Sequence, residues 1–286
     1  MKRTITYLAI SVFALLVFLS CEKEADNIKY PVFNQKLVVF GILSPGNEKN
    51  FISVNSTIKI YGPIFSIVKW GNMTATISDG TNEISLDTTI GGFVFRSSDF
   101  SVEEGKTYTL RIKSDFGLSA EASCTVPFRR NCNIEIDTTM RQYYDTPDTG
   151  NSYTWINLDL YFNDFKGETN YYRLLSEITS YRSTIPLYYS PGEGNEFSVI
   201  SDKGRDGERF KITMPGHWKG GLSDSTFLKA YLLNTDKVYY DYQKSLENYS
   251  SGEDPFTEPA PLYSNITGGL GIFAAYTVDS LIFRLK

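Results

Sequence analysis

The sequence has little of the chemistry on which enzymes most often depend. Its 286 residues include one histidine, His217, which excludes histidine-rich metal sites and leaves room for at most one Ser-His-acid arrangement. The patterns G-x-S-x-G and H-E-x-x-H and a phosphate-cradling glycine loop are all missing. The acid pairs Asp202 with Asp206 and Glu253 with Asp254 could bind calcium or serve a glycosidase, but a solvated loop explains them more simply. We therefore expect no enzyme, no metal site and no cofactor.

The longest uncharged apolar run near the N-terminus, Tyr7–Leu19, is shorter than the about 20 residues that span a bilayer. It follows two basic residues and ends at Leu19-Ser20-Cys21, where a small residue stands directly before a cysteine. This pattern resembles the lipobox of bacterial lipoproteins, which implies a signal peptide over residues 1–20 and acylation of Cys21. Two or three acyl chains, at about 0.8 kcal/mol per buried methylene, would anchor the chain to a bilayer. An ordinary signal peptide beside an unrelated cysteine is the alternative.

A short charged stretch, residues 21–29, separates the apolar run from the first strand. Its Glu22, Lys23 and Glu24 are similar to the surface-export signal of Bacteroidota lipoproteins. The resemblance implies a lipid-anchored protein of the outer membrane that faces the cell surface. A solvated tether explains the same residues, and residence in the periplasmic leaflet is then the alternative.

Two cysteines remain once Cys21 is acylated, Cys124 and Cys132. In an oxidising compartment they could close a small loop with a disulfide worth roughly 2–3 kcal/mol, and two reduced thiols are the alternative.

Positive charge is in deficit, whereas aromatic residues are plentiful. The net charge of −5 argues against nucleic acid as a partner, because duplex binding depends on neutralising phosphates. The 20 tyrosines and 19 phenylalanines, with frequent glycine and proline, favour sheets joined by turns over helical bundles.

Residues 30–126 have the two-residue period of β-strands. Tyr108, Leu110 and Ile112 alternate with polar residues, and Ser78-Asp79-Gly80-Thr81 is typical of a hairpin turn. About seven short strands at this spacing predict an immunoglobulin-like or transthyretin-like β-sandwich.

A turn-rich stretch over residues 127–152 is interpreted as a linker to a second β domain, residues 153–286. Alternation around Ile156–Phe162 and Leu281–Leu285 predicts its first and last strands, in a second sandwich or a half-open barrel. One helix, over residues 237–251, is expected to pack against this domain. Its apolar positions are Val238, Tyr239, Tyr242, Leu246 and Tyr249.

Several segments carry a resemblance to a known family. They are Lys36–Gly41, Phe162-Asn163-Asp164, Asn170-Tyr171-Tyr172-Arg173 and Asp254–Tyr276. With the lipobox, they resemble the Bacteroidota lipoproteins known as domain of unknown function 4249, over nearly the whole chain after the signal peptide. Such lipoproteins are typically encoded beside TonB-dependent outer-membrane receptors. The resemblance therefore implies an accessory or capture subunit in nutrient import, and it implies no catalytic or ligand residues.

The last segment supplies a candidate partner surface. Its residues are Phe256, Tyr263, Asn265, Gly268, Gly269 and Gly271. Dense glycines allow positive φ or close backbone approach, which suits a partner or ligand, but they also suit a bulged strand beside the helix. Similarly, Trp70, Trp155 and Trp218 could form a sugar- or peptide-stacking platform or belong to the core.

The function expected from the sequence is a non-catalytic subunit of a TonB-dependent importer. Its expected partners are the lipid bilayer, through acylated Cys21, and an outer-membrane barrel. A stand-alone surface module for glycan or peptide binding or adhesion is the alternative, and a hydrolase that depends on His217 is a weaker one.

Overall fold

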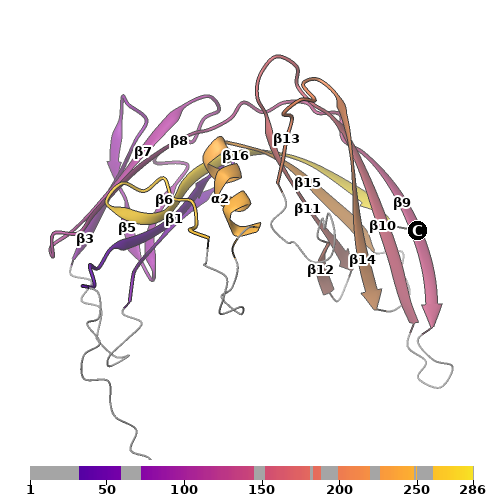
Figure 1. The fold of residues 1–286 in the computed structure, drawn as a ribbon, viewed down its shortest axis with the longest axis horizontal. Coiled ribbons are helices and arrows are strands. Elements are labelled where there is room, and N and C mark those ends of the chain that lie inside the picture. The colour runs from indigo at the N-terminus through magenta and orange to yellow at the C-terminus, as the bar shows by residue number, and fades with distance from the viewer. Residues whose placement is uncertain are drawn as a thin grey trace, which may run out of the picture. The chain divides into compact units, whose positions relative to one another are not determined.

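The computed structural model describes residues 32–58, 72–144, 152–180, 183–187, 199–219, 226–247, 249 and 260–285 (Figure 1). The expected signal peptide and tether, with Cys21, Glu22, Lys23 and Glu24, lie outside these residues, as does Phe256. Within them the chain is mainly β with one helix, which confirms the predicted fold class. Among these same residues, no helix has the length and apolar character needed to cross a membrane.

The first hydrophobic core lies between two sheets. Its strands are β1 (Leu37–Leu43), β2 (Lys49–Ser56), β3 (Met73–Ser78), β4 (Glu83–Ser85), β5 (Asp87–Thr89), β6 (Gly92–Arg96), β7 (Thr107–Ser114) and β8 (Ser119–Thr125). One sheet has the order β4-β3-β7-β8, and the other contains β1, β2, β6 and β5. Alternate residues enter the core, including Val39 and Ile52 from one sheet and Leu110 and Ile112 from the other. This arrangement confirms the sandwich expected for the first half of the chain.

The loop before β7 is pinned by a buried tyrosine. The hydroxyl of Tyr108 donates to the carbonyl oxygen of Ser101 (3.0 Å) and accepts the N–H of Glu103 (2.8 Å). The Tyr108 side chain is fully buried and meets Phe100 edge to face. This geometry resembles the tyrosine corner of immunoglobulin sandwiches.

A second core lies between a three-stranded sheet and the other half of the larger sheet. Its strands are β9 (Glu135–Tyr144), β10 (Ser152–Asn163), β11 (Tyr171–Ser180), β12 (Ser183–Leu187), β13 (Val199–Ser201), β14 (Arg209–Lys219) and β15 (Phe227–Thr235). The three-stranded sheet has the order β14-β10-β9. Ile156 and Leu158 of β10 are fully buried in this core, together with Leu228 and Ala230 of β15.

The linker predicted over residues 127–152 is wrong in its centre, because it contains β9. This strand pairs with β10 from Glu135 to Tyr144 and forms an edge of the three-stranded sheet. Ile136 and Met140 of β9 are only partly buried against the core. An edge strand that buries few apolar side chains shows only weak alternation of apolar and polar residues, so its sequence resembles a linker.

One strand joins the two halves of the chain. In β16 (Gly269–Arg284), residues Gly269–Ala275 pair in parallel with β1, and Tyr276–Arg284 pair antiparallel with β15. The larger sheet therefore runs without a break in the order β12-β11-β15-β16-β1-β2-β6-β5, with β13 beside β11 (Figure 1). The prediction of two separate β domains is corrected accordingly: there are two cores, but they share a sheet.

The helix α2 (Lys237–Glu247) begins where the sequence predicts. Asp236 caps it, since its Oδ1 accepts the N–H of Tyr239 at 2.8 Å. The predicted end at residue 251 is wrong, because Tyr249 has no helical structure. The N–H of Tyr249 donates to the carbonyl oxygen of Leu246 (3.1 Å), an i→i−3 contact that tightens the chain at the helix end.

The predicted disulfide between Cys124 and Cys132 is also wrong, because both thiols are free. Cys124 belongs to the first core and Cys132 to the second. Although the two residues are close in the sequence, the chain passes from one core to the other between them.

Candidate functional site

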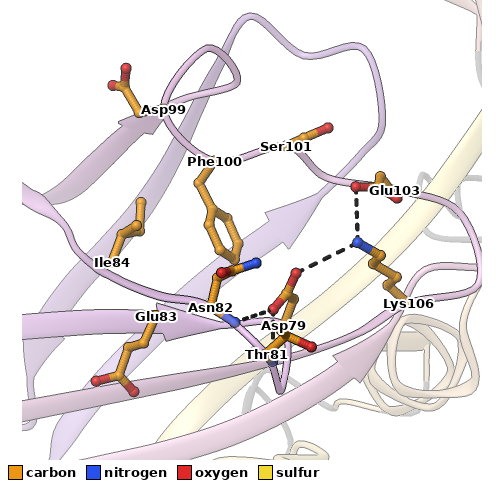
Figure 2. Close-up of a pocket in the computed structure, with 10 residues that line it drawn as sticks. All are labelled: Asp79, Thr81, Asn82, Glu83, Ile84, Asp99, Phe100, Ser101, Glu103 and Lys106. Atoms are coloured by element: carbon orange, nitrogen blue, oxygen red, sulfur yellow. Dashed lines mark hydrogen bonds and ion pairs between the residues drawn. The ribbon is translucent and has the colours of Figure 1, made fainter.

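A polar hollow of about 560 Å³ lies beside the hairpin that joins β3 to β4 (Figure 2). The turn predicted at Ser78–Thr81 forms this hairpin, with Gly80 at a φ of 87°. Asp79 Oδ1 accepts the N–H groups of Thr81 (2.9 Å) and Asn82 (2.7 Å). These two backbone hydrogen bonds hold the pKa of Asp79 below its ordinary value.

Lys106 provides the positive charge of this hollow. Its Nζ lies 2.9 Å from Glu103 Oε1 and 3.6 Å from Asp79 Oδ2 (Figure 2). The hydrogen bond to Glu103 is the main cause that raises the pKa of Lys106. The described lining contains neither histidine nor cysteine, so it offers no imidazole base and no thiolate. The hollow has the chemistry to bind a polar ligand, and its acids are already partly neutralised.

Three carboxylates meet where β10, β13 and β14 end or begin. Asp164 follows β10, Asp202 follows β13, and Asp206 lies in the turn before β14. One oxygen from each lies within 4.8 Å of the others. The sequence singled out Asp202 and Asp206 as a pair, and the structure adds Asp164, which sequence analysis noted only as part of a family segment.

Backbone N–H groups and the Tyr172 hydroxyl already donate hydrogen bonds to these carboxylates. Asp164 accepts the Tyr172 hydroxyl at Oδ1 (2.6 Å) and the Gly207 N–H at Oδ2 (2.7 Å). Asp202 Oδ2 accepts the N–H of Asn170 at 2.9 Å. Asp206 Oδ1 similarly accepts the N–H of Gly167 at 2.7 Å. The cluster therefore folds the loops together, and a cation would have to share its oxygens with these donors.

Burial raises the pKa values of Tyr172 and Cys132, which lie near this cluster, and of Cys124 in the first core. Burial and the Asp164 carboxylate raise the pKa of Tyr172 far above its ordinary value. Burial raises the pKa of Cys132 to about 11. Burial likewise raises the pKa of Cys124 well above its ordinary value. Burial therefore disfavours the thiolate, which is the nucleophilic form, at both cysteines.

The glycines of the predicted partner surface lie against other strands of the same chain. A methyl group on Gly271, whose φ is 103°, would lie 1.9 Å from the carbonyl oxygen of Val39. One on Gly268 would lie 2.6 Å from Ser119 O, and one on Gly269 would lie 2.8 Å from Leu37 O. The glycines thus allow β16 to pass close to β1 and β8, which matches the bulged-strand alternative.

Two other residues predicted on the same surface, Asn265 and Tyr263, also form hydrogen bonds within the chain. Asn265 accepts the N–H of Phe273 at Oδ1 (2.9 Å), and its Nδ2 donates to Phe273 O (2.8 Å) and Ser123 O (3.1 Å). The Tyr263 N–H donates to Ser245 Oγ at 2.9 Å. These bonds fix the segment before β16 to β8 and α2.

The single histidine and the three tryptophans lie in different parts of the chain. His217 and Trp218 lie in β14, whereas Trp70 lies outside the described residues. Trp155 of β10, whose backbone pairs with His217 on one side and Arg141 on the other, is 36% exposed. Among the side chains that the structure describes, Trp155 is the member of the predicted stacking platform that lies on a surface.

A band of exposed and half-buried apolar side chains crosses the face of the larger sheet that is turned away from the first core. It consists of Val38, Phe40, Phe51, Val94 and Leu270. Val38 pairs with Leu270, and Phe51 pairs with Val94, so these side chains share one face. Phe40, Phe51 and Leu270 are 42%, 47% and 40% exposed. Phe40 also meets Tyr242 of α2 edge to face, with ring centroids 6.1 Å apart.

The family model described as Domain of unknown function (DUF4249) matches residues 23–282. The chain belongs to the DUF4249 family. Neither a curated protein nor a solved structure matches it significantly. The DUF4249 match spans both cores, α2 and most of β16.

The segments that carried the resemblance have defined places in this DUF4249 chain. Asp164, Asn170 and Tyr172 form the hydrogen-bonded carboxylate cluster. The described part of the last segment, residues 260–276, contains Asn265 with its hydrogen bonds to Phe273 and Ser123, and it forms the first half of β16. Both segments therefore hold the fold together, and the apolar band lies beside the second one.

Proposed function

We propose that this DUF4249 protein is a Bacteroidota outer-membrane lipoprotein, anchored through acylated Cys21 and facing the cell surface. It acts as a non-catalytic accessory or capture subunit of a TonB-dependent nutrient importer. The apolar band formed by Val38, Phe40, Phe51, Val94 and Leu270 is the observation that carries the protein–protein part of this proposal. The lipobox-like sequence that ends at Cys21, two residues before the family match begins at residue 23, supports the anchor.

A partner protein suits the band for energetic reasons. Two phenylalanine rings and a leucine, each at least 40% exposed, gather on a sheet face, whereas single exposed apolar residues need no explanation. Rigid aromatic side chains lose little conformational entropy on binding and often form the central contacts of interfaces.

The test is recovery of a barrel from detergent-solubilised outer membranes with the tagged protein. We expect the wild-type protein to bring down a large outer-membrane barrel. The double variant Phe40→Ser, Phe51→Ser should lower the recovery at least tenfold, because it removes two apolar anchors. Phe116→Ser is the matched control, since Phe116 is 57% exposed in the turn between β7 and β8. A barrel that never co-purifies, or one that the band variant retains in full, refutes the importer proposal.

The anchor has its own test. Labelled palmitate should enter the wild-type chain and not the Cys21→Ser variant, and the variant should leave the membrane fraction. Retention of the Cys21→Ser variant in the membrane would contradict the anchor without touching the interface. A protein that is acylated but always recovered without a barrel would instead favour a stand-alone surface module.

A further inference from the structure

A second surface feature lies on the three-stranded sheet, away from the apolar band. A hollow of about 280 Å³ opens on the outer face of β9 and β10, lined by Thr139, Arg141, Trp155 and Asn157. Trp155 pairs directly with Arg141, and Asn157 pairs with Thr139. Ile156, between the two lining residues of β10, is fully buried in the second core, so the four lining side chains point outward.

The indole of Trp155 is exposed but held in place. Its Nε1–H donates to Asn157 Oδ1 at 3.0 Å, two residues along the same strand. Because this bond orients the ring before any ligand arrives, binding does not have to pay for ordering it. An indole that is 36% exposed and lines a hollow beside hydrogen-bonding groups is suited to the C–H face of a sugar ring, with the polar groups around its rim.

Arg141 supplies the positive charge of this hollow. Its side chain is exposed, and within the described residues its guanidinium makes no hydrogen bond or ion pair. Farther along the same face the charges are paired, as in Glu135 with Arg209 (2.6 Å) and Asp159 with Lys211 (2.9 Å). Among the side chains that the structure describes on this face, Arg141 of the hollow is thus a cation without a paired acid.

The remaining acid on β9 does not cancel this charge. Asp137 lies four residues from Arg141 along the strand, which is about 13 Å at ~3.3 Å per residue. That separation exceeds the Debye length of about 8 Å at physiological ionic strength. A planar guanidinium donates two parallel hydrogen bonds to a carboxylate, so the charge complementarity favours an acidic ligand.

We propose that this hollow binds one uronate ring of an acidic glycan. The sugar face stacks on Trp155, the sugar carboxylate binds Arg141, and Thr139 and the Asn157 amide bind ring hydroxyls. The volume lies at or below the lower end of the ~300–1,000 Å³ range of ligand sites, which suits a single ring. This assignment does not depend on the importer, because it uses neither the apolar band nor Cys21.

Affinity electrophoresis of the full mature chain in mild detergent tests the proposal. Native gels contain polygalacturonate, alginate or hyaluronan as acidic polymers, and dextran or mannan as neutral ones. We expect at least one acidic polymer to retard the protein and the neutral polymers to retard it at least tenfold more weakly. Trp155→Ala and Arg141→Ala should each weaken the retardation at least tenfold. Trp155→Phe should keep part of it, as should Arg141→Lys, which retains charge but loses the planar fork.

Tyr161→Ala is the matched control. Tyr161 is an aromatic residue on the same face of β10, flanked by Arg209 and Lys211, and it lies outside the hollow. Its replacement should leave the retardation unchanged. The proposal is overturned if no acidic polymer retards the protein, if neutral polymers do so equally, or if Trp155→Ala binds like wild type. Binding of an acidic peptide such as tetraglutamate in place of the polymers would also overturn the glycan assignment.

Discussion

Replacing Gly271 by alanine should damage the fold at the point where β16 meets β1. The new methyl group would lie 1.9 Å from the carbonyl oxygen of Val39, far inside van der Waals contact. The backbone at Gly271 also has a φ of 103°, which L residues adopt at a cost of about 1–3 kcal/mol. Relieving the overlap requires a backbone shift that costs about 1–3 kcal/mol more. We therefore expect Gly271→Ala to lower the free energy of unfolding by about 2–6 kcal/mol.

A second glycine, Gly80, allows the conformational cost of an alanine substitution to be measured without the cost of steric overlap. Gly80 has a similar φ of 87°, but a methyl group there would meet no atom within 4 Å. Gly80→Ala should therefore cost only the conformational part, about 1 kcal/mol. The measurement is urea unfolding of a soluble form expressed from residue 22 onward, followed by circular dichroism. A difference below about 0.5 kcal/mol between the two variants would refute the claim that the backbones of β16 and β1 touch at Gly271.

Three further predictions follow from the described contacts. Burial raises the pKa of Asp236 to about 7, so the folded chain holds a proton that the unfolded chain releases. The unfolding free energy should consequently fall by up to about 4 kcal/mol as pH rises from 4 to 7, and Asp236→Asn should remove that slope. Asp164→Asn should cost about 2–3 kcal/mol, because it leaves the Tyr172 hydroxyl or the facing N–H without its charged acceptor. Cys124 and Cys132 should be inert to a thiol reagent at pH 8 and both react in guanidinium, as free buried thiols do.

Equal pH slopes for the wild-type protein and Asp236→Asn would show that Asp236 does not titrate differently on folding. For the carboxylate cluster, Asp159→Asn is the matched control, because Asp159 pairs at the surface with Lys211 and should cost less than about 1 kcal/mol. A gel shift of the soluble form on reduction, or rapid labelling of the native chain, would contradict the two free thiols.

Local features of the chain were predictable from the sequence because their causes are local. The alternation of Tyr108, Leu110 and Ile112 marks a strand with one face in a core, since successive side chains point to opposite faces. The Asp79-Gly80 pair forms its turn through hydrogen bonds within four residues. The helix start after Asp236 depends on a side-chain cap three residues away.

The tertiary structure decided the contacts between residues that are distant in the sequence. The pairing of β1 with β16 joins residues more than 200 positions apart, and it makes the glycine-rich run Gly269–Gly271 part of the strand that unites the two cores. The separation of Cys124 from Cys132 depends on where the chain leaves one core for the other. The hollow at Trp155 exists because β9 places Arg141 beside it, and β9 has too weak an apolar period to be recognised alone. Such pairings are set by the free energy of burying whole faces, which no short window of sequence contains.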